Sequence, residues 1–190
     1  MMTEPVEDFV LTSSQNLRIA GAVFEAWPRI RHKIAIGFLN RLRERLKKEL
    51  KSWEFQVDEV DDRYFEEPWS TFFLWKPNWK NHSVGLQFAA YGEKMQFGVY
   101  RDKVIHGKPY CGELVEKLKE IDPSARTNNC WEGVTAMRSP AADWRSPEVL
   151  WRMHTDKKFL EDVARQLLEV AKASEPGRLR DAGGLAIVGA

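Results

Sequence analysis

The sequence contains little cysteine: only Cys111 and Cys130 among 190 residues. Two cysteines are too few for the disulfide framework that stabilises small secreted proteins. Both cysteines and His106 are isolated, without the Cys-x-x-Cys or His-x-x-x-His spacing that zinc sites use. The first residues also lack the basic and apolar segments of a secretion signal. We therefore expect a cytoplasmic protein without a zinc site.

Long apolar runs and a strong net charge are also missing. The longest uninterrupted apolar segments span only a few residues, whereas crossing a bilayer takes about 20, so we expect no membrane association through a spanning helix. The formal net charge is +1, so no global field directs the chain to nucleic acid. The composition, 43% hydrophobic and 30% charged, is typical of a globular protein. The length and the composition predict one domain over residues 1–177. Residues 178–190 are rich in Gly and Ala, so we predict that they form a mobile tail.

No catalytic signature is present. The sequence has no Gly-x-Ser-x-Gly motif, no Gly-rich phosphate loop and no Walker lysine, and no nucleophile can be assigned from it. The sequence suggests no cofactor either. We therefore favour a protein that is not an enzyme and that carries no cofactor.

Apolar residues recur at helical spacing near both ends of the chain. Residues 1–12 are acidic and show no such pattern; Ser13 and Ser14 then offer an N-cap, and Pro28 is expected to interrupt the helix that follows. The helix after Pro28 should be the longest, with a broad apolar stripe that needs a surface to pack on. The predicted helices span residues 14–27, 28–51, 112–121, 147–153 and 157–174.

Between these helices the apolar period changes from helical to alternating. Gly92 lies in a short loop between two strands, which form the most secure hairpin, and residues 77–81 supply a second turn. Such short connections predict an antiparallel meander. The predicted strands span residues 53–61, 70–76, 83–91, 95–101 and 130–138. The fold class is therefore α+β, with an antiparallel sheet of four or five strands packed against N-terminal and C-terminal helices.

Aromatic residues are concentrated in the predicted sheet: thirteen of the twenty-two lie within residues 53–100. Alternation along a strand points Phe73 and Trp75 to one face and Phe72 and Leu74 to the other. Core packing is the simpler interpretation of so many rings; the alternative is a recognition surface for a protein partner, since Trp, Tyr and Arg concentrate binding energy. The candidate anchors of such a surface are Trp69, Trp75, Trp79 and Arg101.

Residues 29–51 are strongly basic, with nine lysines or arginines against Glu44 and Glu49. A helix with several cations off its apolar stripe suits non-specific nucleic-acid binding, because each neutralised phosphate releases counterions. The solvated face of an amphipathic helix is the simpler interpretation. Under the nucleic-acid alternative, the contacting residues are Arg41, Arg43, Arg45, Lys47, Lys48 and Lys51.

The segment that follows is acidic: residues 54–67 hold seven carboxylates against Arg63 alone. Blocks of opposite charge so close in sequence can complement each other within the fold or across a homodimer. A second alternative is a metal-dependent nuclease-like protein, in which Asp58 and Asp62 share one side of a strand and offer oxygen ligands for Mg²⁺ or Mn²⁺. A charged strand edge that discourages edge pairing is the simpler interpretation.

Residues 75–100 combine a turn containing Trp79, an apolar strand, and a second strand with the step Phe97-Gly98-Val99. In this pattern the chain resembles the accessory C-terminal region of some bacterial PD-(D/E)XK nuclease-like proteins, over about residues 69–170. The nuclease core of that family needs a strand-borne Asp followed by Glu/Asp/Gln-x-Lys, which this chain does not supply. The resemblance therefore implies a free-standing recognition module, with bacterial or phage defence or counter-defence as its setting.

Overall fold

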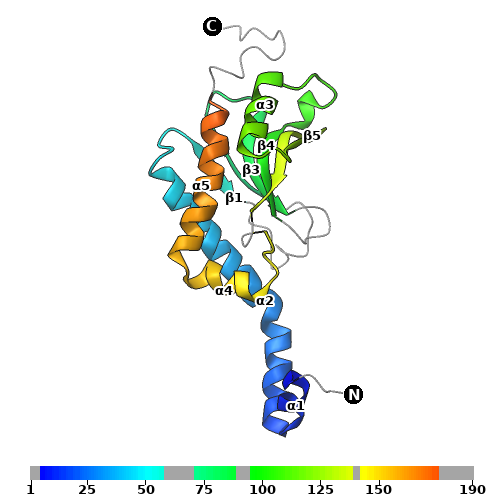
Figure 1. The fold of residues 1–190 in the computed structure, drawn as a ribbon. Helices are drawn as coiled ribbons and strands as arrows, with labels where there is room; N and C mark the ends of the chain where they lie inside the picture. The colour runs from blue at the N-terminus through cyan, green and yellow to red at the C-terminus, as the bar shows by residue number, and fades with distance from the viewer. Residues whose placement is uncertain (1–4, 58–70, 89–94, 139–141, 176–190) are drawn as a thin grey trace.

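The computed structural model describes residues 5–57, 71–88, 95–138 and 142–175; the predicted tail lies outside these ranges. The helices are α1 (Pro5–Leu11), α2 (Ser14–Lys47), α3 (Gly112–Ile121), α4 (Pro147–Thr155) and α5 (Lys157–Ala173), with a 3-10 helix η1 (Lys103–Ile105). The strands are β1 (Glu54–Val57), β2 (Thr71–Trp75), β3 (His82–Phe88), β4 (Met95–Arg101), β5 (Arg126–Asn128) and β6 (Trp131–Ala136). Helices from both ends of the chain pack beside the sheet (Figure 1), so the α+β class is confirmed.

The six described strands form one antiparallel sheet in the order β1-β2-β3-β4-β6-β5. β1 to β4 are the predicted meander. β3 and β4 pair from His82 opposite Arg101 to Phe88 opposite Met95, as expected for the hairpin, whereas the loop around Gly92 lies outside the described residues. The sequence pattern does not predict β5, which has three exposed residues. The sheet therefore has one strand more than the four or five expected.

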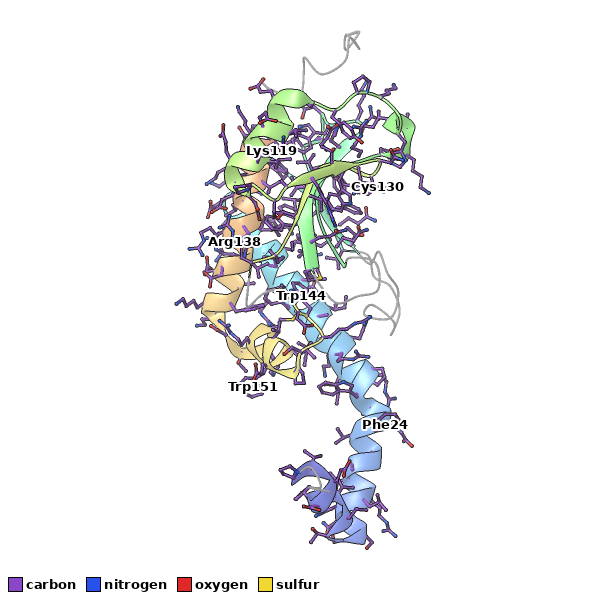
Figure 2. All side chains as sticks on the ribbon, turned by 45° about the vertical axis from the view of Figure 1, so that its right-hand side comes forward. Phe24, Lys119, Cys130, Arg138, Trp144 and Trp151 are labelled. Atoms are coloured by element: carbon purple, nitrogen blue, oxygen red, sulfur yellow. The ribbon has the colours of Figure 1, made fainter. Side chains whose placement is uncertain are left out.

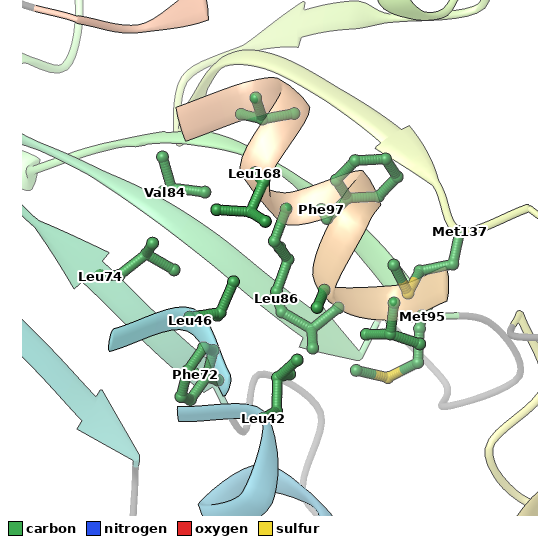
Figure 3. Packing of buried hydrophobic residues seen from close by; sticks show 14 of the residues in the cluster. Leu42, Leu46, Phe72, Leu74, Val84, Leu86, Met95, Phe97, Met137 and Leu168 are labelled. Atoms are coloured by element: carbon green, nitrogen blue, oxygen red, sulfur yellow. The ribbon is translucent and has the colours of Figure 1, made fainter. Parts of the chain in front are cut away.

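The main core lies between α2, α5 and one face of the sheet (Figure 3). Phe72 and Leu74 of β2 point into this core and are fully buried, whereas Phe73 and Trp75 on the same strand are half-buried, which confirms the predicted alternation. The α2 side chains that have no exposed surface in this core are Ala35, Phe38, Leu39, Leu42 and Leu46. The predicted apolar stripe of this helix thus has its packing surface.

Two glycines allow a close approach between β4, β6 and α3. A Cβ atom at Gly98 would lie 2.0 Å from the carbonyl oxygen of Gly133, and a Cβ at Gly133 would lie 2.5 Å from Leu118 Cδ1. Both distances are far below van der Waals contact, and the first neighbour is backbone, which cannot rotate away as a side chain can. A larger residue at Gly98 would therefore force the two strands apart.

The predicted break at Pro28 is wrong, because α2 is one continuous helix with Pro28 inside it. A proline in a helix interior loses one backbone hydrogen bond and crowds the preceding turn, at a cost of about 3 kcal/mol. Helix formation is cooperative, so established turns on both sides extend through one missing bond. Ser13 caps the helix by accepting a hydrogen bond from the Asn16 backbone N–H at 3.1 Å. The helix ends at Lys47, four residues before the predicted residue 51.

The sequence pattern also does not predict α1, which lies beside the first turns of α2. Asn16 Nδ2 donates a hydrogen bond to the Phe9 carbonyl at 2.8 Å, and the Thr12 hydroxyl donates to the Asp8 carbonyl at 2.7 Å. Figure 1 shows the two helices projecting together from the rest of the molecule. We call residues 5–26 the arm. Residues 27–34 are the junction, and the other described residues are the body.

Candidate functional site

The predicted aromatic anchors do not form an exposed patch. Trp79 packs against Trp53, with ring centroids 5.0 Å apart, and Trp75 is half-buried. Arg101 is 1% exposed, which corrects its prediction as a surface anchor, because a partner cannot reach a buried guanidinium. Trp69 lies outside the described residues. Arg101 is therefore excluded as an anchor, and the partner surface with Trp69, Trp75 and Trp79 stays a prediction.

The sheet face opposite the main core carries a row of aromatic rings. The rings of Phe73 and Tyr100 have centroids 5.2 Å apart, and Tyr100 meets Trp131 edge to face at 5.4 Å. Trp131 is buried, and the other two rings are half-buried. Rings in such mutual contact stabilise the fold. This arrangement agrees with the simpler interpretation of the aromatic content, which is packing.

Arg101 belongs to a buried charged cluster near the ends of β3 and β4. Its Nη1 lies 3.2 Å from Glu132 Oε1, and its Nη2 donates to the carbonyl oxygens of Ile105 and Lys108 at 2.7 and 2.8 Å. The guanidinium also lies over the Tyr110 ring, 4.6 Å from its centroid. A buried arginine is tolerated when it is paired and hydrogen-bonded in this way. Arg101 therefore holds the segment after β4 against the sheet.

Glu132 is the centre of this cluster and is 2% exposed. Its Oε1 lies 3.1 Å from His82 Nε2, and its Oε2 accepts a hydrogen bond from the Cys111 backbone N–H at 3.0 Å. Burial raises the pKa of Glu132, but the bonds to His82 and Cys111 and the charge of Arg101 outweigh burial and lower that pKa. Burial raises the pKa of the Cys111 thiol, which disfavours the nucleophilic thiolate. The cluster thus joins β6 to the start of α3.

Several of the predicted nucleic-acid contacts on α2 already meet an acceptor. Arg45 Nε bonds both carboxylate oxygens of Glu161, at 2.9 and 2.8 Å, and Arg45 Nη2 lies 2.9 Å from Glu49. Arg41 donates a hydrogen bond to the Met153 carbonyl of α4. These two arginines therefore help to hold α2 against α4 and α5.

Glu44 accepts two more of the predicted cations: Lys47 Nζ lies 3.0 Å and Arg43 Nε 3.3 Å from its Oε1. Lys48 and Lys51 are exposed, and within the described ranges neither has a carboxylate partner. Ion pairing lowers the charge that is left to meet phosphates. Of the six predicted contacts, Lys48 and Lys51 are thus the two without a described acceptor, and the nucleic-acid alternative stays a prediction.

An open groove of about 620 Å³ lies between α2 and the α4–α5 pair. Met153 and Leu160 give it an apolar floor, and its rim holds charges of both signs, among them Arg45 and Glu161. These two rim charges are paired with each other. The groove therefore lacks a field of one sign that would select a charged ligand.

Asp58 and Asp62, the candidate metal ligands, lie outside the described residues, with the rest of the predicted first strand beyond Val57. Over residues 5–57, 71–88, 95–138 and 142–175, no group of three or more His, Cys, Asp or Glu side chains is placed to hold a metal ion. No helix in the same ranges combines the length and the apolar character needed to cross a bilayer. The metal alternative stays a prediction.

The arm gathers most of the exposed apolar side chains of the described chain (Figure 2). Seven of its large apolar residues are more than half exposed, and in the described body only Val104 and Trp151 reach that level. Single exposed apolar residues are normal on a protein surface, but a gathering marks an interaction site. The seven residues are Val6, Phe9, Leu11, Leu17, Ile19, Val23 and Phe24.

Two of these side chains continue the buried stripe of α2. Leu17 lies about five helical turns before Ala35, and Phe24 lies about five turns before Leu42, so each pair shares one line along the helix. Ala35 and Leu42 have no exposed surface, whereas Leu17 is 56% and Phe24 is 82% exposed. The body covers this line at one end of the helix, and no described residue covers Phe24 at the other.

A scan against protein-family models found no match to this chain, and searches of the curated proteins and of the solved structures found no significant match. The resemblance of about residues 69–170 to an accessory region of PD-(D/E)XK nuclease-like proteins therefore stays a prediction. The exposed arm is the feature from which a function can be inferred.

Proposed function

We propose that this chain is a non-enzymatic interaction module that binds a protein partner through the arm. The proposal depends on one observation: seven large apolar side chains, each more than half exposed, on a projecting pair of helices. Burying apolar surface contributes about 25 cal/mol per Å². Monomeric proteins rarely leave a large contiguous apolar patch in water. A partner that covers the arm gives Leu17 and Phe24 the burial that the body gives Leu42.

The arrangement of the arm also suits a helix-mediated interface. Leu17 and Phe24 are spaced i, i+7, the spacing by which a helix presents anchors to an apolar surface. Charged residues, including Arg18 and Glu25, are exposed on the same helix. An apolar centre with a polar rim is the usual composition of a protein interface. The partner surface is therefore expected to be apolar, with charges at its border.

The test compares the wild-type chain with Leu17→Glu/Phe24→Glu and with a matched control, Val104→Glu, whose side chain is 73% exposed on the body. Each whole chain is produced in its native host and cross-linked in the cells, and proteins attached to residues 5–26 are identified by mass spectrometry. We expect a defined partner with the wild type and the control. Its recovery should fall at least about tenfold with the double variant, because a carboxylate in an apolar interface is costly.

The same proteins recovered at equal levels from all three chains would contradict the proposal. So would the absence of any protein attached to the arm. Circular dichroism and thermal unfolding of the purified variants check that the folds are intact, which we expect because all the substituted side chains are exposed.

A further inference from the structure

Building on the proposed function of the arm, we propose that the partner places an acidic amphipathic helix along a second side of α2. Its apolar residues cover Ile19, Val23 and Ile30, and its carboxylates meet Arg29 and Lys33. This side is distinct from the apolar line described above, so the partner holds the arm from two directions. Three features of the structure support this arrangement: the position of these side chains round the helix, the elements that border them, and the charges beside them.

Ile19, Val23 and Ile30 form one apolar strip on α2. At 3.6 residues per turn they lie within about 40° of one another, and Val23 lies about 100° round the helix from Phe24. Their side chains are 51%, 51% and 38% exposed. The spacings of four and seven residues are those by which one helix packs along another. The strip is about 16 Å long, a length that three turns of a partner helix cover.

Helices of the chain itself cover this side of α2 before and after the strip. Asn16, about 20° round the helix from Val23, donates a hydrogen bond to the Phe9 carbonyl of α1. Arg41, five turns beyond Val23 on the same line, donates one to the Met153 carbonyl of α4. Figure 2 shows α1 and α4 on one side of α2, with a stretch of α2 between them. A third helix, supplied by the partner, therefore fits between these two.

Exposed cations border the strip along one edge. Lys33 lies about 40° and Arg29 about 80° round the helix from Ile19, and both are exposed. Within the described ranges neither forms an ion pair, and Glu25 lies at least about 120° from every residue of the strip. Opposite charges at the border of an interface speed association and fix the register of the two surfaces. The partner helix is therefore expected to carry Asp or Glu along this edge.

The charge pattern favours a protein helix over an anionic lipid surface. Helices that lie on anionic membranes carry lysine and arginine on their polar face. Helix α1, beside the first turns of α2, instead presents Glu7 and Asp8 and has no lysine or arginine. A surface with one sign of charge would repel α1 while it attracts Arg29 and Lys33. A protein helix can place its carboxylates at the junction alone.

Photo-crosslinking in the native host tests where the partner lies. In separate whole chains, p-benzoylphenylalanine replaces Ile19, Ile30 or, as a matched control, Val104, which is 73% exposed on the body. We expect both strip positions to label one segment of one protein, with helical apolar spacing and more carboxylates than cations. The two labelled residues should lie about 11 residues apart, because helices packed side by side rise equally per residue. The control position should not label this segment.

Charge reversal tests the contact with the carboxylates. Arg29→Glu/Lys33→Glu is compared with Lys48→Glu/Lys51→Glu, which makes the same change of charge at exposed lysines of the body. Recovery of the labelled segment should fall at least about tenfold with the first variant and stay unchanged with the second, because like charges then meet at the strip alone. Replacing the carboxylates of that segment by lysine should restore its recovery with Arg29→Glu/Lys33→Glu. Such a rescue also shows that the reversed chain is folded.

A labelled segment that is basic or lacks helical apolar spacing would overturn the inference. So would labelling of lipid, of a second copy of this chain, or of nothing, and so would equal recovery with and without the charge reversal. The proposed function is tested separately, because Leu17→Glu/Phe24→Glu changes the other side of α2. A partner lost with that variant but not with Arg29→Glu/Lys33→Glu would overturn the inference alone. A host in which no protein depends on either variant would overturn both.

Discussion

Helix α2 places one apolar line in two different surroundings. Toward the body, Ala35 and Leu42 have no exposed surface, whereas Leu17 and Phe24, on the same line in the arm, are more than half exposed. The helical pattern is similar in both halves, and the difference is whether the rest of the chain covers it. The body therefore gains folding stability from its apolar residues, while those of the arm remain available for association. Substitutions that are matched in chemistry should separate the two regions.

The largest contrast is expected between two glycines. Gly98→Ala brings a Cβ atom to 2.0 Å from the Gly133 carbonyl oxygen, so we expect a loss of more than about 4 kcal/mol of unfolding free energy, or failure to fold. Gly21 in the arm has no atom within 4 Å of a Cβ placed there, so Gly21→Ala should stabilise the helix by about 0.5–1 kcal/mol. Urea denaturation measures both. A small loss at Gly98 would contradict the close approach of β4 and β6.

A second contrast concerns buried and exposed carboxylates. Glu132→Gln should lower the free energy of unfolding by about 3–5 kcal/mol, because Arg101 then stays buried without its counter-charge. Glu25→Gln, exposed in the arm, should change it by less than about 0.5 kcal/mol. Chemical denaturation at neutral pH compares the two variants. Equal effects would show that the charged cluster contributes no more than an exposed side chain.

The same carboxylate makes the stability of the body depend on pH. The pKa of Glu132 is lowered in the folded chain, so its contribution is complete above the ordinary value of 4.5 and is lost as the pH falls through the lowered folded-state pKa. Unfolding followed as the pH falls below 4.5 should therefore bring the stability of the wild type closer to that of Glu132→Gln. A gap that does not change with pH would exclude Glu132 as its cause.

The third contrast lies on the shared line of α2. Leu42→Ala should lower the free energy of unfolding by about 2–5 kcal/mol, since it leaves a cavity in the core. Phe24→Ala removes a larger side chain, yet at concentrations where the chain is monomeric it should change stability by less than about 0.5 kcal/mol. Thermal unfolding at low protein concentration measures both. A comparable loss from Phe24→Ala would mean that the arm packs on the body.

The smallest effect is expected at the surface of the body, where side chains are exposed to solvent as they are in the arm. Glu161→Ala removes the partner of Arg45, and Glu161 is 52% exposed in that ion pair. Exposed pairs contribute about 0.2–1 kcal/mol, and salt weakens them. Urea denaturation at low and high salt should show this small loss shrinking as salt is added. A loss that stays constant would point to packing and not to charge.

The elements with strong local signals are those that the sequence predicts well. Helix α3 spans Gly112–Ile121, as predicted, because its apolar period is clear and Asp122 with Pro123 ends it. The alternation of Phe72 and Phe73 is likewise confirmed in β2. β5 has three exposed residues and therefore no alternation that could reveal it. Periodic burial is thus the part of the fold that a single sequence carries most clearly.

The buried cluster could not be predicted, because its partners come from different elements. Arginine is rarely fully buried, so sequence alone places Arg101 on the surface. The fold brings Glu132 from β6 and the carbonyls of Ile105 and Lys108 around it. Pro28 is a related case, since the local preference against helix before a proline yields to the cooperativity of the long helix around it.

The sequence predicts the helix of the arm but not its exposure. Leu17 and Phe24 have helical spacing, and the pattern correctly predicts an amphipathic helix there. A pattern of this kind shows which side of a helix is apolar but not what lies opposite, so it cannot show that α2 extends beyond the sheet. Ile19 and Val23 lie at least about 100° round the helix from that line, and this spread of apolar residues over more than one side of the helix was the available signal.

The close approach at Gly98 has a consequence for how this protein changes over evolutionary time. Because the neighbouring carbonyl belongs to the backbone of Gly133, no change elsewhere in the side chains can make room for a Cβ there. Selection should therefore hold Gly98 fixed in any lineage that keeps this sheet, while Phe24 drifts together with whatever surface it meets. Distant descendants of the same ancestor would share Gly98 long after their arms had diverged.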